Sequence, residues 1–375
     1  MEYVALKDVC KINMGQSPDS SSYNDKKEGI PFYQGNADFG EKHPIPRVWC
    51  NAPTKIAQPE DILMSVRAPI GALNYAQEKC CIGRGLAAIT PDKDKLSLEF
   101  LYWFLRGKNS ELNSKGTGST FKAISKKTLE EIRVPLIDLE KQQKMAQALE
   151  KTYSVIQMRT KQLKELDDLI KARFVEMFGH QSHNEKSLPY MTIDDVAEIY
   201  LGITHTPTYV DSGVIFISAK NTSGDFLDLS DVKYISREEF EGAPKGSKPK
   251  ANDVLFSRVG SNLGHPVILE EELELCTFVS LGFLRSKGTV TSNYLKHWMR
   301  DEFFARQVSE HVKGGGQPNL NTGWLKEFKI IVPDMDQQKK FDAFCCQIDK
   351  SKATVQKALD ETQLLFDSLM QQYFG

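Results

Sequence analysis

The chain has 375 residues, a formal net charge of −2 at pH 7 and 40% hydrophobic residues. This length is sufficient for two globular domains with separate cores. No apolar run reaches the roughly 18 residues that a membrane span needs, and no signal-peptide pattern opens the sequence, so we expect a cytoplasmic protein. The charge does not indicate an autonomous DNA-binding protein, since such proteins usually carry a basic excess.

The cysteine and histidine residues argue against disulfides and metal. Seven cysteines are present, an odd number, and none has CxxC spacing. Only His180 and His183 are close together among the histidines, in a polar stretch. We therefore expect no disulfide framework and no metal site.

The first 137 residues contain short apolar runs separated by glycine, proline and asparagine. Asp61–Val66, Cys81–Ile89 and Ile132–Leu136 predict strands, and the spacing of apolar residues in Leu98–Leu112 predicts a helix. Strands with one embedded helix indicate an α+β domain.

Two long helices are predicted from about 139 to 178 and from about 336 to 374. From Met145 to Met177, and again from Phe341 to Tyr373, seam residues recur at alternating intervals of four and three, which is typical of a coiled coil. Each position in the second series lies 196 residues after its partner. The 33 residues of the first series would extend about 50 Å.

The repeat continues outside the helices, which indicates a tandem duplication. The matched segments share apolar, glycine or amide residues in the same order: Asp61-Ile62-Leu63 with Asp253-Val254-Leu255, Lys115–Pro135 with Lys313–Pro333, Gln142-Gln143-Lys144 with Gln337-Gln338-Lys339, Asn36 with Asn221, and Phe178-Gly179 with Phe374-Gly375. We expect four parts: domain 1 at 1–137, a central helical spacer at 138–180, domain 2 at 181–335 and a C-terminal helical spacer at 336–375.

An antiparallel pairing of the two helices, with Met145 beside Tyr373, brings Thr152 to Phe366, Arg159 to Leu359 and Lys352 to Leu166. In this register no polar seam residue meets another, so we favour it over a parallel homodimer. The pairing residues are apolar seam positions: Leu149, Ile156, Leu163, Leu166, Ile170, Ile348, Val355, Leu359, Phe366 and Leu369. The alternative is two amphipathic core helices without this pairing.

No catalytic motif is recognisable. The sequence has no GxxxxGK[ST] loop, no HExxH motif and no Asn/Asp-Pro-Pro-aromatic tetrad. Gly116–Thr120 resembles a phosphate-binding loop, but it does not open a helix after a strand. Binding is therefore the favoured activity.

Candidate DNA-binding residues lie in glycine-rich segments and after strand-like runs, where Lys, Arg, Ser, Thr, Gln and Asn can contact phosphates and base edges. They are Gln16, Ser17, Gln34, Asn36, Arg67, Arg84, Lys115, Ser119 and Lys122 in the first half, and Thr204, His205, Lys220, Asn221, Arg258, Ser261, Asn262, Lys313, Gln317 and Asn319 in the second. The alternatives are flexible connections and surface ion pairs.

The sequence resembles the specificity subunits of type I restriction-modification enzymes. The resemblance covers nearly all 375 residues and rests on the Gly15-Gln16-Ser17-Pro18 turn, the repeated strands, the Gln-Gln helix openings and the terminal Phe-Gly pairs. It implies two target-recognition domains, each followed by a long helix, with the two helices pairing as an antiparallel coiled coil. It also implies a non-catalytic reader of a bipartite, asymmetric DNA site.

The resemblance further implies partners. They are double-stranded DNA, methyltransferase subunits, two in number, and restriction subunits, with no membrane. S-adenosylmethionine, and ATP with Mg for restriction, would bind these partner subunits, and no cofactor is expected in this chain. The net charge leads us to expect weak DNA affinity without the methyltransferase. Two alternatives are open: a methyltransferase or nuclease with unrecognised motifs, and a coiled-coil scaffold.

Overall fold

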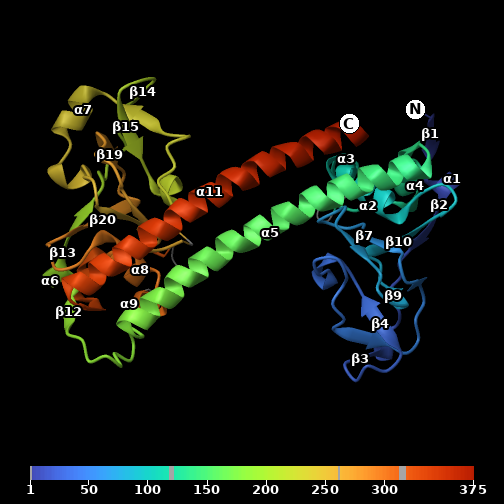
Figure 1. The fold of residues 1–375 in the computed structure, drawn as a ribbon, viewed down its shortest axis with the longest axis horizontal. Helices are drawn as coiled ribbons and strands as arrows, with labels where there is room; N and C mark the ends of the chain where they lie inside the picture. Colours follow the sequence, from blue (N-terminus) through green and yellow to red (C-terminus); the bar gives the residue numbers. More distant parts are fainter. Residues whose placement is uncertain (1, 118–121, 261, 312–317) are drawn as a thin grey trace. The chain divides into compact units, whose positions relative to one another are not determined.

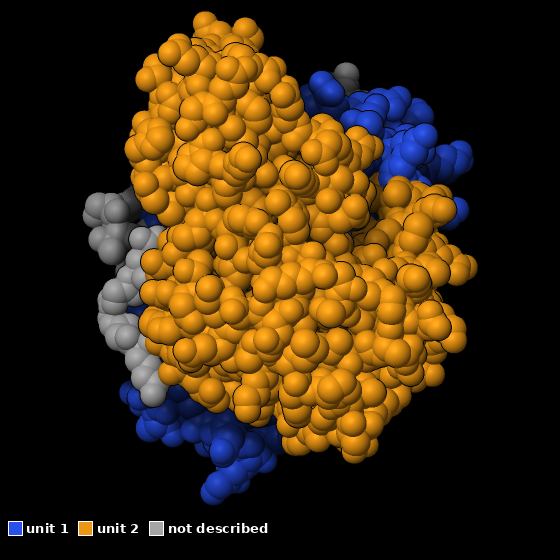
Figure 2. Space-filling model, turned by 90° about the vertical axis from the view of Figure 1, so that its left-hand side faces the viewer, with its two compact units in different colours: residues 1–160, 357–375 blue, residues 161–356 orange. Residues whose placement is uncertain are grey.

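The computed structural model of the chain describes residues 2–117, 122–260, 262–311 and 318–375. Contacts between residues divide the chain into two compact units, coloured separately in Figure 2. Unit 1 comprises Met1–Thr160 and Lys357–Gly375, and unit 2 comprises Lys161–Gln356. Each unit therefore contains an α/β part together with segments of both long helices. The four-part boundaries expected from the sequence remain a prediction.

Unit 1 contains two sheets and a short strand pair, and most neighbouring strands are antiparallel. The first sheet has the order β2 (Cys10–Met14), β10 (Leu86–Pro91), β7 (Ile62–Ser65), β8 (Leu73–Tyr75). The second has the order β3 (Tyr23–Asn24), β5 (Val48–Cys50), β4 (Ile30–Tyr33), β9 (Cys80–Ile82), β6 (Ile56–Ala57), with β4 and β9 parallel. The pair joins β1 (Glu2–Ala5) to β11 (Arg133–Leu136).

The helices of unit 1 bury large aromatic side chains. The shorter helices of this unit are α1 (Leu6–Val9), α2 (Leu98–Gly107), α3 (Asn109–Ser114) and α4 (Lys126–Glu130), with 3-10 turns η1 (Ser20–Ser22) and η2 (Asn36–Asp38). Phe100, Trp103 and Phe104 of α2 are fully buried, in a core that also includes residues of the first sheet and both long helices. Ser97 caps α2 by accepting a hydrogen bond from the Phe100 amide.

Two element predictions for unit 1 are wrong in part. The run Cys81–Ile89 forms two strands, β9 and β10, because the Gly83-Arg84-Gly85 turn separates them. The run Leu98–Leu112 forms two helices, since α2 ends at Gly107, a weak helix former. The predicted strands at Asp61–Val66 and Ile132–Leu136 are confirmed as β7 and β11.

Unit 2 repeats this arrangement, but its second sheet has four strands among the described residues where that of unit 1 has five. Its first sheet has the order β13 (Ala197–Leu201), β20 (Leu281–Ser286), β17 (Val254–Ser257), β18 (Pro266–Ile268). Its second has the order β14 (Tyr209–Val210), β16 (Lys233–Ile235), β15 (Val214–Ile217), β19 (Leu275–Thr277), and β15 and β19 are parallel, as β4 and β9 are in unit 1. The strand pair joins β12 (Tyr190–Thr192) to β21 (Lys329–Ile331). The fold of the two units thus agrees with the duplication predicted from the sequence.

The shorter helices of unit 2 are α6 (Ile193–Val196), α7 (Arg237–Gly242), α8 (Ser292–Met299), α9 (Glu302–His311) and α10 (Thr322–Glu327), with 3-10 turns η3 (Ala219–Thr222) and η4 (Lys245–Ser247). Helix α8 corresponds to α2. It buries Tyr294 and Trp298, as α2 buries Phe100 and Trp103.

Two 40-residue helices, α5 (Leu139–Phe178) and α11 (Met335–Phe374), confirm the predicted long helices (Figure 1). In unit 1 the Tyr153 and Phe366 rings lie 5.8 Å apart. In unit 2 the Phe174 and Phe341 rings lie 5.5 Å apart. Within each unit, residues of α5 with rising numbers meet residues of α11 with falling numbers, so the packing is antiparallel in the expected register.

One detail of the predicted seam is wrong, because two polar seam residues do meet. The Arg159 guanidinium donates hydrogen bonds to the Ala358 carbonyl and to the Thr362 hydroxyl. The long arginine side chain extends past its direct neighbour to a carbonyl and a hydroxyl on the opposite helix. The Lys352 ammonium likewise pairs with Asp167, next to the expected neighbour Leu166.

All ten predicted pairing residues are buried or half-buried. Leu149, Ile156 and Phe366 belong to the core of unit 1, whereas Ile170 and Ile348 belong to the core of unit 2. Among the described residues, no helix combines the length and apolarity needed to cross a membrane.

The helix openings match with a shift of one residue from the predicted alignment. Gln142 of α5 corresponds to Gln338 of α11, because each is fully buried and makes equivalent bonds with the residues preceding α2 or α8. The constant offset of 196 residues therefore includes the first helical turn.

Candidate nucleic-acid interface

In unit 1, the loops that follow β2, β4, β7 and β9 meet at one junction built on glycine. A Cβ atom at Gly15 would lie 2.1 Å from the Gly83 carbonyl oxygen, and one at Gly85 would lie 2.3 Å from the Gln34 carbonyl oxygen. Only glycine permits these approaches. The Val66 amide donates to the Gly85 carbonyl at 2.9 Å, which adds the loop after β7.

Four predicted DNA-binding residues come together at this junction. Gln16, Gln34 and Arg84 are exposed, and Ser17 is half-buried. The Arg84 amide lies 3.5 Å from the Ser17 hydroxyl oxygen. Residues from three separate loops thus present amide, hydroxyl and guanidinium groups on one surface.

Arg67 and Lys122 form the adjoining part of this surface. Both are exposed, and the Ala68 amide donates to the Lys122 carbonyl at 3.0 Å. Lys115, in contrast, pairs with Glu111 at 2.6 Å on the helix it follows. Asn36 is half-buried at the start of η2. Its predicted match with Asn221 is wrong, because Asn221 is the third residue of η3 and Asp38 is the third residue of η2.

Unit 2 has the same junction with different residues. A Cβ atom at Gly202 would lie 2.2 Å from the Phe278 carbonyl oxygen. The Ser280 hydroxyl accepts from the Ala219 amide at 3.1 Å, and the Ser280 carbonyl accepts from the Arg258 amide at 2.8 Å. The loops after β13, β15, β17 and β19 therefore converge.

The predicted DNA-binding residues of the first two loops of unit 2 differ in solvent exposure and in their bonds to neighbouring side chains. Thr204 and His205 are exposed, and His205 Nε2 lies 2.9 Å from Glu239. Lys220 is exposed and pairs with Asp231 at 2.9 Å. Asn221 is only 3% exposed. Its amide bonds within its own loop, so in this conformation it supports the loop.

Arg258 is a half-buried connector between loops. Its guanidinium donates to the carbonyls of Leu320 at 3.3 Å and Val279 at 3.1 Å, and burial lowers its pKa. The corresponding position in unit 1 is Val66, since β7 and β17 align Ser65 with Ser257. Exposed Arg67 thus has no arginine counterpart.

Asn262 and Asn319 of unit 2 are exposed. Four further predicted residues lie outside the described residues: Ser119, Ser261, Lys313 and Gln317.

Two residues that hold the loops of these junctions together were not identified from the sequence. Thr54 donates from its hydroxyl to the Gln16 carbonyl at 2.6 Å, and Ser280 connects three loops as described above. Neither residue belongs to a motif, but the Gly83-Arg84-Gly85 pattern is a signal for the close backbone approach at Arg84.

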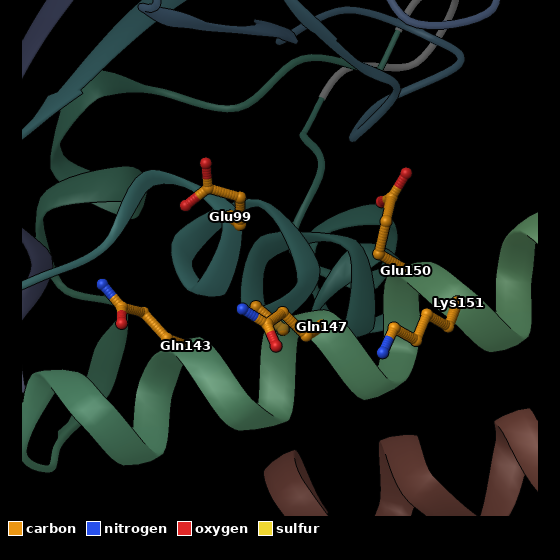
Figure 3. Close-up of a pocket in the computed structure, with 6 residues that line it drawn as sticks. Glu99, Gln143, Gln147, Glu150 and Lys151 are labelled. Atoms are coloured by element: carbon orange, nitrogen blue, oxygen red, sulfur yellow. The ribbon is translucent and has the colours of Figure 1, made fainter.

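A cavity of about 490 Å³ lies elsewhere in unit 1. Figure 3 shows Glu99 of α2 beside Gln143, Gln147, Glu150 and Lys151 of α5. Its lining does not contain a nucleophile paired with a base. Within the described ranges, no group of three His, Cys, Asp or Glu residues is arranged to hold a metal ion.

The structure defines a duplicated α+β protein with paired long helices and one loop junction in each unit. The chain matches the family model for the type I restriction modification DNA specificity domain twice, over residues 1–168 and 186–361. These matches cover most of the chain, and the chain belongs to this family.

Two curated relatives carry names of the same kind. A relative from Methanocaldococcus jannaschii, named as the type I restriction enzyme MjaX specificity subunit, is 45% identical over 157 residues. That alignment covers 42% of this chain and 37% of the relative. The type I restriction enzyme EcoBI specificity subunit of Escherichia coli is 20% identical, over 99% of this chain and 85% of that protein.

Two solved structures have the same fold over the full chain. The type I restriction-modification system S subunit from M. genitalium gives a TM-score of 0.63 at 14% identity, covering 100% of this chain and 96% of that chain. A second structure, from work on complex assembly and conformational transition of the type I restriction-modification system, gives 0.56 at 18% identity, covering 100% and 97%.

Proposed function

We propose that this chain is a DNA reader without catalytic activity, in which each unit recognises one half of a bipartite, asymmetric site. The observation that carries the proposal is the duplicated loop junction. The same strands deliver Gln16, Gln34 and Arg84 in unit 1 but Thr204 and Lys220 in unit 2. Equal scaffolds with unlike side chains suit two half-sites of different sequence.

The partners in this proposal are methyltransferase and restriction subunits that dock on the chain. S-adenosylmethionine, and ATP with Mg, would bind those subunits. The names of the relatives support this assignment. The net charge of −2 supports a reader that relies on its partners for much of the phosphate contact.

A segment exchange tests the division of labour. Residues 1–139 are replaced by the matching segment of a relative with a different specificity, and the complex with the methyltransferase subunit methylates DNA. We expect one half of the methylated motif to change and the other half to remain. An unchanged motif would exclude the reading function and favour a scaffold.

The absence of catalysis needs a separate measurement. The purified chain is incubated with DNA and labelled S-adenosylmethionine, before and after the methyltransferase subunit is added. We expect incorporation of label only after the addition. Incorporation by the chain alone would identify it as a methyltransferase.

A further inference from the structure

In unit 2, the loop of residues 218–231 follows β15 and carries the predicted DNA contact Lys220. The loop is folded around the buried Asn221 side chain. Asn221 Oδ1 accepts from the Ser218 amide at 3.0 Å, and Nδ2 donates to the carbonyls of Asp228 and Asp231, each at 3.0 Å. These bonds close the loop on itself, so we expect it to move as one piece.

The Asp225 carboxylate forms the ion pairs that connect this loop to the helical part of unit 2, where the Phe226 ring also lies 5.8 Å from the Lys296 ammonium and 5.9 Å from the Lys352 ammonium. Asp225 Oδ1 accepts from Arg300, between α8 and α9, at 2.8 Å, and Oδ2 accepts from Lys352 of α11 at 3.1 Å. Lys352 also pairs with Asp167 of α5, and its side chain is only 10% exposed. Burial disfavours the ionised form of Asp225, but Arg300 and then Lys352 outweigh this effect and lower its pKa to about 2. The Asp225 carboxylate is therefore ionised at neutral pH.

Unit 1 has a counterpart with the charges reversed. Asp38 closes the turn η2 by accepting from the amides of Gln34 at 2.7 Å and Gly35 at 3.4 Å, as Asn221 closes η3 by accepting from the Ser218 amide. Four residues after Asp38 is Lys42, as Asp225 is four residues after Asn221. Lys42 pairs with Glu150 of α5, but both side chains are exposed, at 53% and 43%. Exposed pairs are weak and are screened by salt.

We propose that Asp225 is a positioning residue for DNA reading, which holds the loop of Lys220 against α11 and so fixes the geometry in which unit 2 meets its half-site. The inference rests on the proposed DNA-reading function. Because the matching pair in unit 1 is exposed, reading by unit 1 depends far less on Lys42.

The test uses the full chain in complex with the methyltransferase subunit. Methylation rates are measured on the cognate DNA and on DNAs with one base changed in either half. For Asp225→Ala we expect the preference for the correct base to fall about tenfold in one half only, the half not altered by exchange of residues 1–139. Asp225→Glu should recover most of this preference. Lys42→Ala should change the preference in the other half by at most about threefold.

A matched control and a second variant keep the test decisive. Glu271→Ala removes an equal charge from an exposed position of unit 2, and it should leave both preferences unchanged. If Asp225→Ala does not fold, Asp225→Asn replaces it, with the same expected result, because the amide keeps the shape and loses the charge.

The outcomes separate the two proposals. A wild-type complex without base preference in either half contradicts the proposed function itself. A wild-type complex that discriminates, with an Asp225 variant that keeps both preferences, overturns the positioning role. Equal loss in both halves together with a lower melting temperature also overturns it, since that result indicates a role in stability alone.

Discussion

Lys296 of α8 is a largely buried cation, and its ammonium group lies over the Phe226 ring, 5.8 Å from the ring centroid. It is only 7% exposed, and its ammonium group makes no hydrogen bond or ion pair with any residue that the structure describes. Burial lowers its pKa most, and Arg300 also lowers it, whereas Asp349 and Asp225 raise it. Burial of a charge without an ion pair costs free energy of folding, and a cation–π contact offsets only part of this cost.

Lys296→Met should therefore stabilise unit 2, by about 1–3 kcal/mol at neutral pH. Methionine keeps the apolar stem and removes the charge. Because the pKa of Lys296 is lower in the folded chain, the unfolded chain binds more protons between that pKa and 10.5, and the stability of the wild type rises with pH there. The advantage of the variant should shrink as the pH approaches 10.5. Urea unfolding at pH 7 and pH 9.5 measures both effects, and an advantage that grows with pH would contradict them.

The start of each long helix is held by one buried glutamine side chain. Gln142 Oε1 accepts from the Ser97 amide, and Nε2 donates to the carbonyls of Lys95 and Ile137, all at 2.8 Å. Gln142→Leu leaves these backbone groups without partners. We expect a loss of roughly 2–4 kcal/mol in the free energy of unfolding of unit 1, measured by urea denaturation.

The neighbouring Gln143 provides the control for this helix. It is exposed, so Gln143→Leu should change stability by less than about 0.5 kcal/mol. Similar losses for the two variants would argue against the buried hydrogen bonds as the cause and for a general effect of leucine in the first turn.

The sequence predicted the long helices and the repeat because both follow from periodicity. The break of α2 at Gly107 and the turn at Gly83–Gly85 were missed, because apolar spacing alone does not reveal a local backbone reversal. The seam register was predictable to within a turn. The Arg159–Thr362 contact was not, since it depends on the reach of one side chain.

At the scale of the molecule, the candidate site was only partly predictable. Exposed Arg84 and Gln34 follow strands, and strand ends can be inferred from apolar runs. Asn221 and Arg258 likewise carry amide and guanidinium groups and follow strands. Asn221 is buried, however, and Arg258 is half-buried with its guanidinium bonded to backbone carbonyls. Which side of a loop faces solvent depends on contacts between distant segments, such as Gly202 with Phe278, that a single sequence does not encode in a visible pattern.

The core of unit 1 depends on the last residues of the chain, and this dependence is testable. Phe366 of α11 is 7% exposed and lies 5.6 Å from the Trp103 ring. Residues 357–375 are not members of the unit 2 core. Phe366→Ala should destabilise unit 1 by about 3–5 kcal/mol and leave unit 2 unchanged, whereas Leu364→Ala, at a position that is 71% exposed, should have little effect. In hydrogen exchange measured in increasing urea, Phe366→Ala should accelerate exchange in α2, relative to the wild type, and leave exchange in α8 unchanged. Equal acceleration in both helices would mean that the two cores unfold together.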